Sequence, residues 1–289
     1  MIILGGIWVN EKEAITSVVA IGVNTQRYLE KIQALMNLEE ADVRDCDGIF
    51  ERGLKISQFN FISANVNLNT SVIKESINDN PVCFLIVDAG DRVSLNYAGR
   101  FSEYIQTLDC GLSIALLFGN YNDTLLSKEF ATELYSKFDV IIDLDNLASD
   151  DTGKTIAAYN IIRGINSTLV KPLLCGFDLA SLHLHLKSSG RLQVACAIES
   201  NELDNLYDKK VCMATQSALE EIKKHITIED ARRVFIFIEG NEDYLNIKSL
   251  ENSVMMIDST FPKSIIEWVA STSKTIGNEV RVLIGATNI

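Results

Sequence analysis

The fold is decided by one stretch near the middle of the chain, Thr152-Gly-Lys-Thr-Ile-Ala-Ala-Tyr-Asn-Ile-Ile-Arg-Gly-Ile-Asn-Ser-Thr-Leu-Val-Lys-Pro172. Its apolar residues recur at helical spacing: Ala158, Ile161, Ile162, Ile165 and Leu169. Pro172 cannot continue the backbone hydrogen-bond ladder, so we expect a long helix that stops just before it. The sequence pattern differs on the two sides of this segment, which predicts two domains joined by one long helix.

Upstream of this helix, short continuous runs of Val, Ile and Leu alternate with amphipathic stretches. Such runs are typical of parallel strands covered on both faces by helices. The expected strands are Val18–Val23, Val82–Val87, Leu112–Phe118 and Phe138–Ile142, preceded by a first strand at Met1–Gly6, and the expected helices are Arg27–Met36, Ala98–Thr107 and Leu125–Phe138. The alternation predicts an α/β domain over residues 1–150 with a doubly wound, Rossmann-like, mostly parallel sheet.

Downstream of Pro172 the pattern changes to a mixture of strands and helices. The expected strands are Arg191–Ile198, Val234–Ile238, Ser264–Ser271 and Val280–Ala286, and the expected helices are Met213–Ile226 and Asn246–Ile257. Asn246 stands where an N-cap residue belongs, and the last two strands are predicted to form an antiparallel pair. We therefore expect a central helix over 151–171 and a smaller α+β domain with a mixed sheet over 172–289.

Composition and charge exclude several classes of protein. The 289 residues are 47% hydrophobic and 22% charged, as in globular proteins, and the formal charge is −13. Because this charge repels phosphate backbones and anionic lipid, we expect no nucleic-acid partner and no direct membrane insertion. The six cysteines form no CxxC pair, and the start lacks the basic region of a signal peptide, which together favour reduced thiols and a cytoplasmic location.

Five segments resemble the FtsZ/tubulin superfamily, and FtsZ more than tubulin. Arg163–Pro172 resembles the family's central helix entering its synergy loop, Thr227–Gly240 the entry to its second domain, and Asn278–Ile289 its last strand. In the N-terminal half, Val23-Asn24-Thr25 and Arg52-Gly53-Leu54 resemble segments beside the nucleotide. The resemblance spans essentially the whole chain and implies a GTPase-type domain, a central helix and a second domain.

The positions that the resemblance assigns to GTP binding are largely replaced in this chain. In FtsZ, glycine-rich loops let backbone amides approach phosphate at a helix N-terminus. The matching segment, Ala89-Gly90-Asp91-Arg92-Val93-Ser94-Leu95-Asn96, keeps one glycine and places an aspartate where phosphate is expected. The guanine-contacting positions of the central helix become Asp151, Thr155 and Ile156. Only vestigial pocket positions remain: Gly5, Gly6, Asn24, Thr25, Gly90, Asp145 and Asn146. We therefore expect no bound cofactor, with GTP as the alternative.

The synergy loop that the resemblance identifies lacks one of the family's acidic residues as well. It corresponds to Gly176-Phe177-Asp178-Leu179-Ala180-Ser181, where Asp178 is kept and Ser181 replaces the second aspartate. A serine cannot hold a charge beside a water and a cation, so we expect no GTP hydrolysis, no catalytic residue and no enzyme. The resemblance leaves an assembly surface at Phe177, Asp178 and Ser181. It implies a structural protein that associates with itself head to tail or binds an FtsZ-type partner, in cell division or cytoskeletal organisation.

Two other functions stay open. One is a nucleotide-dependent polymer with an atypical pocket, using GTP, or ATP at the loose P-loop pattern Ala148-Ser-Asp-Asp-Thr-Gly-Lys-Thr155. Acidic residues in this pattern would crowd phosphates and favour an ordinary helix start. The other is a module that binds a different ligand or peptide in the vacated cleft. The resemblance places His183 and His185 on a helix, where residues two apart diverge, and no Cys or carboxylate cluster joins them, so no metal site is expected.

Overall fold

The computed structural model describes residues 16–22, 24–44, 59–64, 77, 80–106, 111–119, 136–170, 173–175, 179–187, 189–200, 209–241, 243–273 and 276–288. Its strands are β1 (Thr16–Ile21), β2 (Phe59–Ala64), β3 (Val82–Asp88), β4 (Leu112–Phe118), β5 (Val140–Asp143), β6 (Leu173–Cys175), β7 (Gly190–Glu199), β8 (Arg233–Gly240), β9 (Ile265–Thr272) and β10 (Val280–Thr287). Its helices are α1 (Gln26–Arg44), α3 (Arg92–Gln106), α5 (Asp151–Val170), α6 (Leu179–Leu186), α7 (Lys210–Ile222) and α8 (Ile247–Thr260), with short 3-10 turns η2 (Leu144–Asn146) and η4 (Ile228–Asp230). None of the described helices combines the length and the apolar composition needed to cross a membrane.

The first half of the sheet is parallel throughout. Strands β2, β1, β3, β4 and β5 lie side by side in that order, and we call them the parallel half. Strands β1, β3, β4 and β5 are almost entirely buried, because α1 and α5 cover one face and α3 covers the other. This arrangement confirms the expected doubly wound α/β fold.

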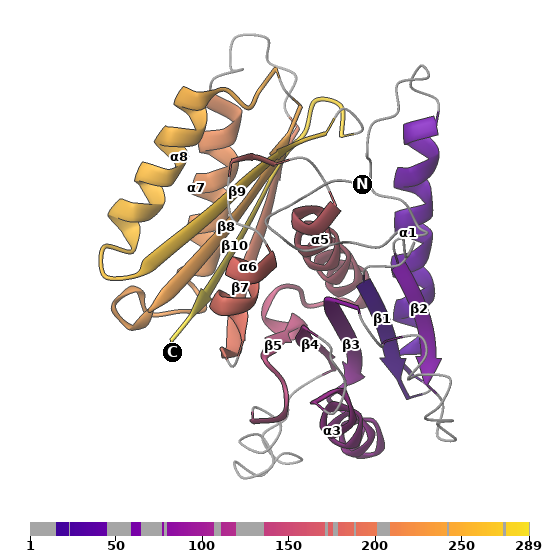
Figure 1. Cartoon of the computed structure of the whole chain (residues 1–289). Helices are drawn as coiled ribbons and strands as arrows, with labels where there is room; N and C mark the ends of the chain where they lie inside the picture. Colours follow the sequence, from indigo (N-terminus) through magenta and orange to yellow (C-terminus); the bar gives the residue numbers. More distant parts are fainter. Residues whose placement is uncertain are drawn as a thin grey trace.

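The second half of the sheet, which we call the mixed half, contains β7, β10, β8, β9 and β6 in that order. Strand β10 is antiparallel to β7 and β8, whereas β9 is parallel to β8. The two halves meet where Gly190 and Arg191 at the start of β7 pair with β5. Figure 1 shows α7 and α8 on the outer face of the mixed half and α5 between the two halves. The expected mixed sheet is therefore confirmed.

The predicted pairing of the last two strands is wrong. Strand β8 lies between β9 and β10 and pairs with both of them. The physical reason is burial: β8 has the sequence Arg-Val-Phe-Ile-Phe-Ile-Glu-Gly and is buried from its second residue to its last, as a central strand must be. Strand β9 begins with Ile265, which is 59% exposed, and fits a more peripheral place.

Other predicted elements vary in outcome. Strands β2 and β6 were not expected, whereas α1, α3, α5, α7 and α8 overlap their predicted ranges. Asn246 caps α8 as predicted, its side-chain oxygen accepting a hydrogen bond from the Ser249 amide at 2.9 Å. The expected strand Met1–Gly6 and nearly all of the expected helix Leu125–Phe138 lie outside the described residues. The domain boundaries at 150 and 171 stay a prediction.

Candidate functional site

Most of the vestigial pocket positions lie where the strands of the parallel half end, which is where open α/β sheets bind ligands. We call this region the carboxyl edge. Asn24 and Thr25 lie between β1 and α1, Gly90 lies between β3 and α3, and Asp145 and Asn146 form part of η2 after β5. Gly5 and Gly6 lie outside the described residues. The structure thus brings the described positions to one edge of the sheet.

The backbone donors at the start of α3 are occupied by carboxylates of the chain itself. Asp91 accepts hydrogen bonds from the amides of Val93 (3.0 Å) and Ser94 (3.1 Å), and Asp88 accepts one from the amide of Gly90 (2.9 Å). An N-terminal carboxylate is favoured here by the helix dipole and satisfies donors that lack an intrahelical partner. These are the kind of donors that hold phosphate when an anion binds at a helix N-terminus.

The ends of β1, β3 and β4 approach one another closely around Asp88. Asn24 Nδ2 donates to Asp88 Oδ2 at 2.9 Å, which links the end of β1 to the end of β3. Ser94 Oγ donates to the Ile21 carbonyl at 2.6 Å and accepts from the Asp88 amide at 3.2 Å. Gly119, after β4, has φ +100°, and a Cβ there would lie 2.8 Å from Asp88 Oδ1. The sequence analysis did not predict these contacts of Asp88, Ser94 and Gly119. The available signals were an acid at the end of one strand, Asp88, and a glycine directly after another, Gly119.

A hydrogen-bonded bridge connects the starts of α1 and α5. Tyr28 donates its hydroxyl proton to Asp151 Oδ1 at 2.8 Å and accepts a hydrogen bond from Arg27 at 2.9 Å, while Arg27 also lies 2.8 Å from Asp151 Oδ2. The Tyr28 ring stacks on Phe118, with centroids 3.9 Å apart. Burial, followed by the Asp151 hydrogen bond, raises the pKa of Tyr28, and the hydrogen bond to Tyr28 raises the pKa of Arg27. Asp151 is one of the positions that the resemblance assigns to guanine contact, and here it belongs to this bridge.

The loose P-loop pattern forms an ordinary helix start. Asp150 Oδ1 accepts hydrogen bonds from the amides of Thr152 and Gly153, both at 2.9 Å, and the Gly153 hydrogen bond is the main reason that the pKa of Asp150 is lowered. Lys154 is only 7% exposed and pairs with Asp145. The amides and the lysine that would meet phosphate in a P-loop are therefore engaged by aspartates.

The acids at the end of β5 act as caps. Asp143 Oδ1 accepts a hydrogen bond from the Asp145 amide at 3.1 Å and so caps η2. Burial raises the pKa of Asp143, although Arg191 lies 3.6 Å from its other oxygen. Within the described part of the chain, no three His, Cys, Asp or Glu residues gather as a metal-binding group.

The predicted assembly surface is described only at its edge. Phe177 and Asp178 lie outside the described residues, and Ser181 is half-buried in α6. The two histidines of α6 diverge as predicted: His183 Nε2 contacts the Gly111 carbonyl before β4, and His185 Nε2 lies 3.0 Å from Glu267 on β9. The two side chains therefore have different partners within the chain.

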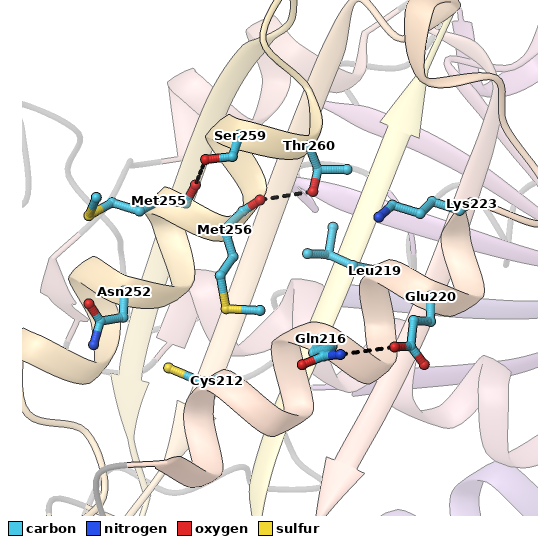
Figure 2. A pocket seen from close by; sticks show the side chains of 10 residues that line it. All are labelled: Cys212, Gln216, Leu219, Glu220, Lys223, Asn252, Met255, Met256, Ser259 and Thr260. Atoms are coloured by element: carbon cyan, nitrogen blue, oxygen red, sulfur yellow. Dashed lines mark hydrogen bonds between the residues drawn. The ribbon is translucent and has the colours of Figure 1, made fainter.

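A separate groove of about 620 Å³ lies between α7 and α8, on the outer face of the mixed half (Figure 2). Cys212 and Leu219 of α7 face Met255 and Met256 of α8 across it. Its hydroxyl groups bond within α8, as in the 2.7 Å hydrogen bond from Ser259 to the Met255 carbonyl. Glu220 in the groove accepts a hydrogen bond from Gln216, also on α7, at 3.0 Å. The positions that the resemblance assigns to ligand binding lie instead at the carboxyl edge, which is therefore the candidate functional site.

Comparisons with known proteins find likeness in structure only. No protein-family model matches the sequence, and neither does any curated protein. Among solved structures, an empty FtsZ dimer from M. jannaschii has 16% identity and a TM-score of 0.69, covering 95% of this chain and 88% of that one. CetZ from Methanosaeta thermophila has 12% identity and a TM-score of 0.63, covering 95% and 86%. TubZ from Bacillus thuringiensis serovar israelensis, in GDP-form protofilaments, has 10% identity and a TM-score of 0.62, covering 96% and 90%.

Proposed function

We propose, from the FtsZ/tubulin fold that this chain has, that it is a cytoplasmic structural protein of that kind which does not hydrolyse GTP. It associates with itself head to tail or binds an FtsZ-type partner, in cell division or cytoskeletal organisation. The observation that carries this proposal is the occupation of the Gly90, Val93 and Ser94 amides by Asp88 and Asp91. A phosphate would have to displace these carboxylates before it could use the same donors.

The magnitude of this obstacle follows from the charges. A unit negative charge placed about 4 Å from a carboxylate costs roughly 1 kcal/mol in water and about 4 kcal/mol near a protein surface. One such repulsion weakens binding by a factor between about 5 and about 1,000. Asp150 at the start of α5 and the Tyr28–Asp151 bridge add two further intramolecular contacts at the same edge. Together, these intramolecular contacts support the proposal that the chain has lost nucleotide binding and has kept assembly.

A second candidate function is a nucleotide-dependent polymer with an atypical pocket. The observation that favours it is the likeness to TubZ in GDP-form protofilaments and to the GTPγS-bound protofilament of a Haloferax volcanii CetZ, which has a TM-score of 0.61. In this case GTP would bind by rearranging the Asp88 and Asp91 contacts, and assembly would depend on it.

Titration calorimetry of nucleotide-stripped protein with GTP and Mg²⁺ separates the two. We expect no heat of binding up to millimolar GTP, because the donors are occupied and the edge is acidic. Micromolar binding would contradict the main proposal and favour the nucleotide-dependent polymer.

Sedimentation velocity on the same sample tests assembly. We expect the sedimentation coefficient to rise with protein concentration equally with and without GTP. Asp178→Arg in the predicted assembly surface should abolish the rise, whereas Asp258→Arg, the same charge change at an exposed site on α8, should not. A wild-type chain that stays monomeric and fails to co-sediment with FtsZ filaments would refute the proposed assembly.

A further inference from the structure

The central helix α5 carries a buried ion pair to the mixed half. Arg163 is 2% exposed and Glu239 on β8 is 0% exposed. The guanidinium donates through both terminal nitrogens to both carboxylate oxygens, with NH2 to Oε1 at 3.0 Å. This fork geometry fixes direction as well as distance, because a planar guanidinium matches a carboxylate in one orientation.

The helix backbone also touches the mixed half beside this pair. A Cβ on Gly164 would lie 3.0 Å from Leu283 Cδ2 and 3.4 Å from Phe237 Cδ1, so the helix sits directly on the side chains of β10 and β8. Glycine at this position allows the close approach. The pair and the close contact occupy adjacent residues of α5.

The same turn of α5 is attached to the parallel half. Thr16 Oγ on β1 donates to Asn166 Oδ1 at 2.6 Å, and both residues are fully buried. Within four residues, therefore, α5 makes one buried directional contact to each half of the sheet. Apolar side chains tolerate small shifts against one another, whereas a hydrogen bond of this kind does not.

A buried ion pair adds little to stability, but in some proteins it fixes one arrangement of the elements that carry it. Removing both charges from water costs roughly as much as their attraction returns, so an apolar pair is often as stable. Any other register of the helix, however, would leave a guanidinium and a carboxylate buried apart from each other. A shift of one turn moves Arg163 by about 5.4 Å and breaks both hydrogen bonds at once.

We propose that Arg163 and Glu239 form a latch that holds α5 in one register on the mixed half and so keeps the two halves of the sheet in a single arrangement. Arg281, the cross-strand neighbour of Glu239 on β10, is bound by Glu279 through its Nε at 3.0 Å and NH2 at 2.9 Å. The latch is independent of nucleotide and of assembly, so it goes beyond the proposed function.

Distance measurements by electron paramagnetic resonance on the monomer test the latch. Spin labels attached through a keto amino acid at the exposed Asn96 on α3 and Asp258 on α8 report on the parallel and the mixed half without using the cysteines. We expect one narrow distance distribution in the wild type. In the double variant Arg163→Met, Glu239→Met, which buries no charge and should fold, we expect a broadened distribution or a second distance.

A matched control removes an exposed pair of opposite charges. Lys224→Met with Glu221→Met deletes the 2.5 Å ion pair after α7 and should leave the distribution narrow. A distribution in the Arg163→Met, Glu239→Met variant as narrow as that of the wild type would overturn the proposal. If that variant does not fold, Arg163→Met with Glu239→Gln, which also leaves no buried charge, takes its place with the same two outcomes.

Discussion

Gly285 on β10 lies under the ring of Phe235, its cross-strand neighbour on β8. A Cβ on residue 285 would lie 2.0 Å from Cε1 and 2.3 Å from Cζ of that ring. Non-bonded carbons pack at about 3.5 Å or more, so Gly285→Ala forces the ring to move by about 1.5 Å. The ring belongs to the apolar cluster that also contains side chains of α5 and α6, so its displacement disturbs the packing of the central helix α5 against the sheet.

The expected cost of Gly285→Ala is about 2 kcal/mol in the free energy of unfolding. Overpacking of a filled core costs about 1–3 kcal/mol, and so close an overlap takes the upper end, about 3 kcal/mol, of which the lower backbone entropy of alanine returns about 0.5–1 kcal/mol. For cooperative unfolding of the whole 289-residue chain, this corresponds to a fall in Tm of roughly 4 °C. With the ring removed by Phe235→Ala, which itself costs about 3–5 kcal/mol, the same glycine substitution should be neutral or stabilising.

Urea unfolding, followed by the fluorescence of Trp268 on β9 in a Trp8→Phe background, measures the free energy of unfolding of four proteins. They are the parent chain, Gly285→Ala, Phe235→Ala and the double variant. Gly99→Ala in α3 is the control, because its Cβ would meet nothing closer than Lys137 Nζ at 3.6 Å and alanine favours a helix. It should stabilise the chain. If Gly285→Ala were harmless, or equally costly with and without the Phe235 ring, the steric argument would be refuted.

Three further predictions concern a cap, a thiol and an acid. Asn246→Ala should lower the free energy of unfolding by about 0.5–2 kcal/mol, because the Ser249 amide loses its acceptor, and urea unfolding measures this. Burial raises the pKa of Cys196 to about 11 from 9.0, so at pH 8 iodoacetamide should alkylate it roughly a hundredfold more slowly in the folded than in the urea-unfolded chain, as peptide mass spectrometry would record. Burial also raises the pKa of Asp143, so the native state favours its protonated form. The stability from this shift is present below the ordinary pKa of 3.8 and lost as pH rises through the raised pKa. Asp143→Asn should therefore gain stability relative to the wild type between pH 3.5 and pH 7, and an equal difference at both pH values would contradict this.

Several elements could be predicted from the sequence because their signals are local. The spacing of Ala158, Ile161 and Ile165 indicates which face of α5 is buried, whatever element packs against that face. These three residues are buried in the structure. The continuous apolar runs of β3 and β4 likewise indicate strands covered on both faces. Asn246 caps α8 through a bond to a residue three positions later, which is a purely local geometry.

The candidate site was predictable only in part. Through the resemblance, Asp91 was recognised as an aspartate where phosphate is expected, and the structure shows that it caps α3 by short-range hydrogen bonds. The Tyr28–Asp151 bridge joins residues 123 positions apart, and neither residue carries a signal for the other. Its existence depends on how α1 and α5 pack on the same face of the sheet.

The sequence by itself determined most of the described helices and strands, although not β2 or β6, and that α5 ends near Pro172, since backbone sterics and apolar periodicity act over a few residues. Only the tertiary structure decided that β8 separates β9 from β10 and that Arg163 meets Glu239. Strand order and buried charge pairing depend on which surfaces the whole chain can bury together. The free energy of that burial is a sum over contacts between residues distant in the sequence, so it cannot be predicted from any single segment.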